Sequence, residues 1–396
     1  MREAQSQISP DRVMEHINAL AGEIGARPPG SENERRAADY VSEQLRAAGV
    51  SDVREHVFKT PRSAGSVFLP YLAAGLAASV IGRMGRLGRV IGGAGLIGLA
   101  IAARRALLLE PPPFFPLIAD AESRSVIARI APRGKVESFI FLSAHLDSPK
   151  ARQMIPFRAL PPANMLTANL PLITAFGTGA AMVLSGLAGR SRRSNSAQLA
   201  FASLFGLTVK MAADEFSPIS PGANGNASGI AALIELAAHL QAHPLENTEV
   251  VFLFTGASSA GGVGMTAYLD QYAPPKDFST FINLQNIGAA ESTLSFISTA
   301  GISAASEYHS APRVTALVNR MAERHPEYGV YSRSAFFLDE TATLRGRGYE
   351  AITLAGVSRG GEVAGWNSIK DTPDTIVPER ITRAVEFIGK ILEELD

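Results

Sequence analysis

The 396-residue chain contains no cysteine. This absence excludes disulfide bonds, thiolate nucleophiles and zinc sites built on cysteine, so any metal would have to be held by His, Asp or Glu. The chain also has no excess charge, because 37 Lys and Arg residues are matched by 37 Asp and Glu residues. This balance gives no electrostatic reason to expect a nucleic acid as a partner.

Two stretches of the chain are far more apolar than the rest. Residues 65–115 are rich in Ala, Leu, Ile, Val and Gly, and residues 161–213 contain two apolar runs around a turn with Arg190, Arg192 and Arg193. The runs approach the roughly 20 apolar residues that a membrane-spanning helix needs. We therefore expect two apolar helical hairpins that insert into membrane lipid and make the protein multi-pass.

Two pairs of buried or interfacial helices are the alternative. The Gly and Ala content, Arg104 and Arg105 favour it, as does a second run of only about 14 clean apolar residues against the usual 18 or more. Arginines flank both ends of the hairpins, so the positive-inside comparison does not choose the side of the membrane on which the rest of the chain lies.

Outside these insertions, residues 1–64, 116–160 and 214–396 alternate between short apolar runs and helical patterns. This alternation is typical of an α/β domain whose mixed, mostly parallel sheet is flanked by helices. Strands are predicted at 53–59, 125–130, 138–143, 249–255, 281–286 and 351–355, and helices at 227–242, 262–272, 312–324 and 378–394.

His145 and Asp147 stand two residues apart at the end of the predicted strand 138–143. Functional groups are commonly found at the carboxyl ends of strands in α/β sheets. A carboxylate so close to a histidine can fix the orientation of a ring that binds zinc. A purely structural His–Asp hydrogen bond is the alternative, and these two residues alone favour it.

Six fragments of the chain, in this order, resemble the motifs of the di-zinc aminopeptidases of peptidase clan MH. That family includes leucyl aminopeptidases, glutamate carboxypeptidase and glutaminyl cyclase, and also non-catalytic relatives such as the transferrin receptor and nicastrin. The resemblance implies a zinc-aminopeptidase-like α/β domain to which the apolar hairpins are additions. The six fragments are residues 27–31, 144–148, 221–230, 254–261, 282–288 and 366–372.

The resemblance also implies a particular set of site residues. In that family two zinc ions, bridged by a carboxylate and a water, polarise the substrate carbonyl while a Glu takes a proton from the water. His145 matches the first zinc ligand, and Asp147 matches the residue that orients it. The positions of the bridging carboxylate, the general base and the three other ligands are occupied by Gly225, Ser258, Ser259, Gln285 and Asn367.

These substitutions predict the loss of metal and of catalysis. Hydroxyls, amides or an absent side chain offer neither the basicity nor the charge to hold two zinc ions, and without a carboxylate no base activates water. We therefore expect a pseudoenzyme without a metal cofactor that has a binding, regulatory or assembly role, with a protein such as an active paralogue as partner. Asn224, Asn226 and Trp366 are candidates for lining its cleft, although Trp366 fits core packing equally well.

An active zinc aminopeptidase that hydrolyses N-terminal residues is the first rival, and it requires zinc and different ligands. A rebuilt mononuclear metal site would need at least three suitable side chains. The candidates for it are His309, Asp339, Glu340, Glu362, Asp371 and Asp374.

Two further rivals need no zinc. Ser258 or Ser259 with His145 would be a nucleophile–base pair, but no Gly-x-Ser-x-Gly elbow surrounds either serine. Finally, the apolar hairpins themselves would carry the function if the chain were a membrane scaffold.

Overall fold

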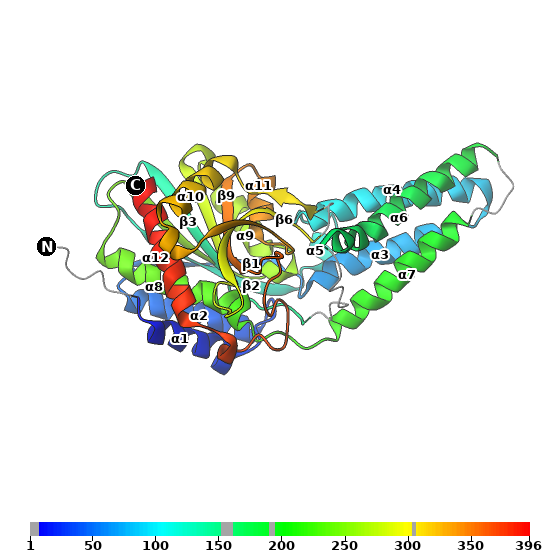
Figure 1. Cartoon of the computed structure of the whole chain (residues 1–396). Coiled ribbons are helices and arrows are strands. Elements are labelled where there is room, and N and C mark those ends of the chain that lie inside the picture. The colour runs from blue at the N-terminus through cyan, green and yellow to red at the C-terminus, as the bar shows by residue number, and fades with distance from the viewer. Residues whose placement is uncertain (1–7, 152–160, 190–194, 303–305) are drawn as a thin grey trace.

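The computed structural model describes residues 8–151, 161–189, 195–302 and 306–396. It consists of a globular α/β domain and an elongated helical bundle that extends from one side of it (Figure 1). The bundle is formed by the two apolar stretches of the sequence, and the domain by the remainder. The arginine-containing turn predicted at 190–193 lies outside the described residues.

In the described residues the domain contains one nine-stranded sheet, ordered β1-β2-β4-β3-β5-β9-β6-β7, with β8 paired to β6. The four strands β4, β3, β5 and β9 are parallel, whereas the pairs toward both edges are mostly antiparallel. The predicted mixed α/β fold is therefore confirmed, with the parallel pairing concentrated at its centre. The strands are β1 Asp52–Thr60, β2 Ala121–Ile130, β3 Ser138–His145, β4 Thr248–Thr255, β5 Ser279–Gln285, β6 Thr293–Ala300, β7 Tyr308–His309, β8 Tyr331–Ala335 and β9 Glu350–Val357.

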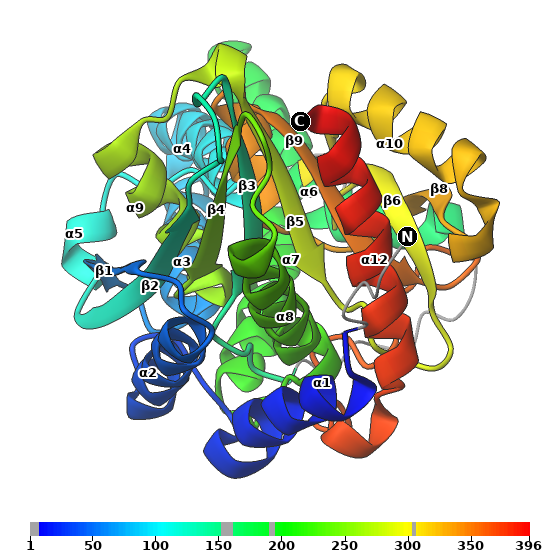
Figure 2. The same ribbon diagram turned by 90° about the vertical axis from the view of Figure 1, so that its left-hand side faces the viewer.

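Helices cover both faces of this sheet. Along β3, Ile140 and Leu142 belong to the larger core, whereas the intervening Phe141 belongs to the smaller core on the opposite face, as the two-residue period of a strand requires. Helices α1, α8 and α12 lie across the face with the larger core (Figure 2). The helices of the domain are α1 Pro10–Ile17, α2 Glu32–Ala47, α8 Ser228–Ala242, α9 Val263–Tyr272, α10 Pro312–Arg324, α11 Glu340–Gly346 and α12 Pro378–Leu395.

Four long helices form the bundle within the described residues: α3 Ala64–Ile81, α4 Gly85–Leu107, α6 Pro161–Leu187 and α7 Ser196–Glu215. Each pair is a hairpin, and the hairpins pack through α4 against α6 and α3 against α7. Glycines allow close approach, since a Cβ on Gly93 would lie 2.5 Å from the Gly179 carbonyl oxygen. The short helix α5 Phe115–Ile118 follows the first hairpin where the chain returns to the sheet.

Three strands of the sheet were not predicted. Strand β6 contains three Ser and Thr residues between its apolar ones, and β8 is largely exposed, so neither has the continuous apolar run of a central strand. Strand β7 has only two residues. All three lie at the antiparallel edge beyond β9 and extend the sheet past the motif-bearing strands.

Candidate functional site

The positions singled out by the sequence converge on one cavity of about 130 Å³. It lies at the carboxyl end of the parallel strands, because β3 ends at His145 and β5 at Gln285. The turn after β4 brings Ser258 and Ser259 to the same edge. The cavity lining includes all six positions that match the family's metal ligands and general base: His145, Gly225, Ser258, Ser259, Gln285 and Asn367.

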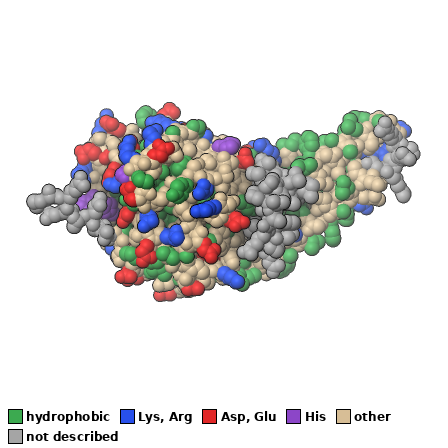
Figure 3. Space-filling model, in the orientation of Figure 1, with side chains coloured by type: hydrophobic (Ala, Val, Ile, Leu, Met, Phe, Trp, Pro, Cys, Tyr) green, Lys and Arg blue, Asp and Glu red, His purple; other side chains and the backbone are tan. Residues whose placement is uncertain are grey.

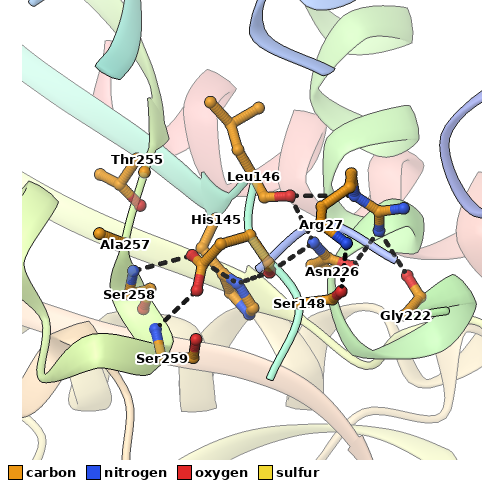
Figure 4. A network of polar contacts seen from close by, with 12 residues as sticks. Arg27, His145, Leu146, Ser148, Gly222, Asn226, Thr255, Ala257, Ser258 and Ser259 are labelled. Atoms are coloured by element: carbon orange, nitrogen blue, oxygen red, sulfur yellow. Dashed lines mark hydrogen bonds and ion pairs between the residues drawn. The ribbon is translucent and has the colours of Figure 1, made fainter. Parts of the chain in front are cut away.

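Asp147 connects His145 to the turn that follows β4. Figure 4 shows His145 together with Ser258 and Ser259 of this turn. Its two carboxylate oxygens accept hydrogen bonds from the main-chain N–H groups of Ser258 at 2.8 Å and Ser259 at 2.9 Å. The Nδ1 atom of His145 lies 2.9 Å from the Asp147 carbonyl oxygen and 3.6 Å from its carboxylate. Asp147 therefore holds both the histidine ring and a turn in which Ala257 has a left-handed φ of 51°.

The two side chains also stabilise each other's charged forms. Burial alone would lower the pKa of His145, but the neighbouring Asp147 carboxylate outweighs burial and raises it. Burial likewise acts to raise the pKa of Asp147, and contact with His145 and the Ser259 N–H lowers it instead. The two side chains thus form an ion pair whenever the His145 ring is protonated.

Arg27 joins three of the sequence motifs beneath the cavity. Its guanidinium is fully buried and donates to the Leu146 carbonyl at 3.1 Å, to Gly222 O at 3.2 Å and to Asn226 Oδ1 at 2.7 Å (Figure 4). Burial lowers the pKa of Arg27 to about 10, so the side chain stays charged at neutral pH. The network explains why these motifs remain although the catalytic residue types do not.

Two residues predicted as candidate cleft residues do not line the cavity. Asn226 is buried in the Arg27 network, and its Nδ2 donates to the carbonyls of Leu146 and Asp147. Asn224 is buried too, and its Oδ1 accepts from the main-chain N–H groups of Gly288 and Ala289. Both side-chain amides form hydrogen bonds with main-chain groups of neighbouring segments. These bonds hold in place the segments that form the cavity wall.

Trp366 fits both of its predicted roles. Its side chain lines the cavity and is also packed, partly buried, against a cluster of hydrophobic residues, with its ring edge toward Phe336. The bundle also forms part of the cavity wall, which no pattern in the sequence predicts. Ala64 and Phe68 of α3, Leu107 of α4 and Leu109 line the cavity beside the polar residues.

The position of the expected bridging carboxylate is bordered by a neighbouring acid. The Asp371 carboxylate accepts hydrogen bonds from the main-chain N–H groups of Asn224 at 2.6 Å and Gly225 at 2.9 Å. A Cβ on residue 225 would lie 3.0 Å from Asp371 Oδ2. Burial raises the pKa of Asp371 to about 6, against the stabilising effect of these hydrogen bonds.

Gln285 is part of a closed hydrogen-bond network rather than a free ligand. Its Nε2 donates to Asp339 Oδ2 at 3.2 Å, and Asn283 Nδ2 donates to the same oxygen at 3.3 Å. Tyr308 and Thr353 donate their hydroxyls to the same carboxylate. Asp339 therefore has its acceptor capacity filled by the protein itself.

Glu340 differs from the other acidic residues of this cavity, Asp339 and Asp371, whose carboxylates are hydrogen-bonded. Both carboxylate oxygens of Glu340 are buried without a hydrogen-bond partner, and the residue is only 1% exposed. Burial raises the pKa of Glu340 to about 7, although the nearby Thr255 hydroxyl and the His145 charge act in the opposite direction. A buried carboxylate with so little compensation is costly, so this residue calls for a functional explanation.

The residues present do not fit a di-zinc centre. Zinc requires several His, Asp or Glu ligands around one point, and within the described residues no group of three such side chains is placed to hold a metal ion. His309, Glu362 and Asp374 are exposed and outside the cavity lining, so they do not rebuild the site. In the described part of the chain neither Ser258 nor Ser259 donates its hydroxyl to His145, which leaves a serine mechanism without its base contact.

The fold is that of the zinc-dependent exopeptidases and glutaminyl cyclases. Its neighbours include the zinc aminopeptidase BSAP from Bacillus subtilis (TM-score 0.60, 13% identity, 99% of this chain and 96% of that chain). A Zn-dependent exopeptidase from Parabacteroides distasonis has a TM-score of 0.58 at 14% identity, over 98% of this chain and 99% of that chain. Porphyromonas gingivalis glutaminyl cyclase has a TM-score of 0.56 at 13% identity, again over 98% and 99%.

Sequence similarity points to the same group. Residues 208–392 match peptidase family M28. This segment runs from the end of α7 through α12, and it contains every substituted site position, from Gly225 to Asn367. No curated protein matches the chain in sequence. The resemblance to the di-zinc aminopeptidases is thus confirmed by the family match and by the fold.

Proposed function

We propose that this chain is a membrane-inserted protein whose M28-like domain binds a ligand without hydrolysing peptides. The single observation that carries the proposal is the composition of the cavity. Of the positions that the di-zinc family uses for metal and base, only His145 retains a suitable side chain, and it is paired with Asp147. The Arg27 and Asp147 networks meanwhile keep the cavity in shape.

Membrane insertion is supported by the length and surface of the bundle. Helices α3, α4 and α7 have 18, 23 and 20 residues and are apolar enough to cross a membrane. At 1.5 Å per residue they are about 27 to 35 Å long, close to the hydrocarbon thickness of a bilayer. In Figure 3 the Lys, Arg, Asp and Glu side chains gather on the globular domain, whereas hydrophobic side chains run along the visible bundle.

The individual side chains on the bundle support the same conclusion. Large apolar residues on a soluble protein are rarely exposed in such density, and here they recur along α4, α6 and α7. Those more than half exposed include Leu87, Ile91, Ile101, Ile173, Phe176, Leu184, Leu187, Leu199, Phe205 and Val209. Lipid tails would cover these side chains, and a protein partner in the membrane such as an active paralogue would be a second way to cover them.

A cysteine-labelling experiment tests the membrane topology. Because the chain lacks cysteine, Met84→Cys at the tip of the first hairpin and Tyr331→Cys on the domain each give a single thiol. Met84 is 72% exposed and Tyr331 52% exposed, so both thiols are accessible before membrane insertion. In sealed vesicles, an impermeant maleimide should label one position and spare the other, with the pattern reversed in inverted vesicles. Equal labelling of both thiols in sealed vesicles of one orientation would contradict insertion.

A further inference from the structure

The cavity of the domain lies next to a second cavity in the helical bundle. A second cavity of about 200 Å³ lies among the bundle helices, and Phe68, Leu107 and Ile302 line both cavities. The side chains of the second cavity are almost all apolar, among them Leu72, Leu99, Ala103, Leu172 and Leu204. A polar chamber and an apolar chamber therefore share one wall.

The polar chamber lacks hydrogen-bond donors for three of its acceptors. Both oxygens of Glu340 and Oδ1 of Asn286 are buried without a partner, and both residues line the cavity. Asn286 is held with a left-handed φ of 56°, and a Cβ on Gly225 would lie 3.9 Å from its Oδ1. Unpaired buried acceptors indicate that a donor from outside the chain completes the site.

The negative charge of the polar chamber indicates that the external donor is a cation. Asp339, Glu340 and Asp371 line it, and neither Lys nor Arg does. His145 also lines it, and its ring lies 3.6 Å from the Asp147 carboxylate. Asp339 is satisfied by the protein and Asp371 by main-chain N–H groups, which leaves the Glu340 carboxylate for an external cation. A primary ammonium group has a positive charge and three N–H donors, and thus matches three unpartnered acceptors. A carboxylate head would instead meet like charge.

We propose that the two chambers together bind a single-chain amphiphile with a primary ammonium head, with the head at Glu340 and Asn286 and the alkyl chain among the bundle helices. This inference rests on the proposed function, since the amphiphile would enter from the membrane that surrounds the bundle. It assigns the emptied metal site a new ligand and gives the unpaired Glu340 carboxylate a role.

Radiolabelled dodecylamine tests the proposal with the full-length chain in phosphatidylcholine nanodiscs, and empty nanodiscs give the partition background. We expect saturable binding of about one molecule per chain, which dodecyltrimethylammonium and dodecanoate displace about tenfold or more weakly than unlabelled dodecylamine, because they lack N–H donors or positive charge. Butylamine should also be weak, since it cannot fill the apolar chamber.

Two pairs of variants test separately the binding of the ammonium head and the binding of the alkyl chain. Glu340→Gln should weaken dodecylamine binding by about tenfold or more, whereas Glu362→Gln, an exposed acid outside the cavity, should not change it. Leu107→Trp should block the shared wall, whereas Ile101→Trp, on the same helix but 54% exposed and outside both linings, should not. If Leu107→Trp does not fold, Ala103→Leu narrows the apolar chamber with a smaller change.

Unchanged binding in Glu340→Gln, or equal displacement by dodecylamine and dodecyltrimethylammonium, would overturn the head-group assignment. Equally strong displacement by butylamine or by tri-alanine with a free N-terminus would show an amine site without a chain-binding chamber, and would overturn the proposal. If dodecylamine fails to bind while Met84→Cys labelling still shows insertion and the protein lacks zinc, the amphiphile is wrong and the proposed function stands.

Discussion

Gly225 and Asp371 are in direct contact at the place where the di-zinc family has its bridging carboxylate. The Gly225 N–H donates to Asp371 Oδ2 at 2.9 Å, and a Cβ on residue 225 would lie 3.0 Å from that oxygen. A side chain at residue 225 would therefore crowd the Asp371 carboxylate.

This contact makes the Gly225→Asp variant unfavourable in the metal-free protein. A second carboxylate would be placed against Asp371, so we expect a loss of about 1 to 3 kcal/mol in unfolding free energy from crowding and like charge. Thermal unfolding of the detergent-purified chain measures it. Gly360→Asp, at an exposed loop position with no backbone within 4 Å, is the matched control. Equal stability of the two variants would show that the contact does not constrain residue 225.

The Asp147 carboxylate should be essential for stability rather than for metal binding. Asp147→Asn removes one of two acceptors for the Ser258 and Ser259 N–H groups and the charge that faces His145. We expect a loss of about 2 to 4 kcal/mol in unfolding free energy, because a buried N–H and a buried cation lose their partners. Asp277→Asn, at an exposed position, should be neutral. A small effect at Asp147 would mean that the left-handed turn at Ala257 does not depend on this side chain.

The pH dependence of stability should reveal the Glu340 carboxyl. Its pKa is about 7 in the folded state against an ordinary 4.5, so between these values the unfolded chain releases a proton that the folded chain keeps. Stability from this group is therefore complete below pH 4.5 and is lost as pH rises through 7, by up to about 3 kcal/mol. Glu340→Gln should match the wild type in acid and exceed its melting temperature progressively up to pH 8. A difference that does not vary with pH would contradict this assignment.

Close packing of glycines should hold the two hairpins of the bundle together. A side chain on Gly93 of α4 would meet the Gly179 carbonyl of α6, whereas one on Gly98, five residues along the same helix, meets no atom within 4 Å. Small residues at such contacts are typical of helix packing in membranes. Gly93→Leu should destabilise the bundle by about 1 to 3 kcal/mol, whereas Gly98→Leu should change its stability by less than about 0.5 kcal/mol. Heat-induced aggregation in detergent compares them, and equal behaviour would argue against this interface.

The central part of the fold could be predicted because both faces of its strands are covered. Strands β3 and β4 are largely continuous apolar runs, a pattern that predicts buried strands from the sequence alone. Strands β6 and β8 are mixed in composition, and β8 is largely exposed. Their place in the sheet depends on pairing with β9 and with each other. No local pattern in the sequence encodes that pairing.

The candidate site could be predicted in its positions but not in its contacts. The motif order placed His145, Gly225 and Gln285 around one point, because each follows or ends a parallel strand or begins a helix beside one. The burial and the hydrogen-bond partners of a residue cannot be predicted in this way, because they depend on segments far apart in the chain. Asn226 is hydrogen-bonded to Arg27, which lies 199 residues away in the sequence. Nothing in the sequence distinguishes Glu340, whose carboxylate is buried only in the folded chain, from the other acidic residues.

The absence of a working di-zinc centre is tested by the metal content of the detergent-purified chain, equilibrated with zinc and run beside a panel of fluorogenic aminoacyl substrates. We expect well below one zinc ion per chain and no hydrolysis. We also expect that restoring the family residues together, as Gly225→Asp, Ser258→Glu, Ser259→Glu, Gln285→Asp and Asn367→His, raises zinc binding toward about two ions per chain. About two zinc ions in the wild type, with hydrolysis that a chelator abolishes, would contradict this expectation and show that other residues hold the metal.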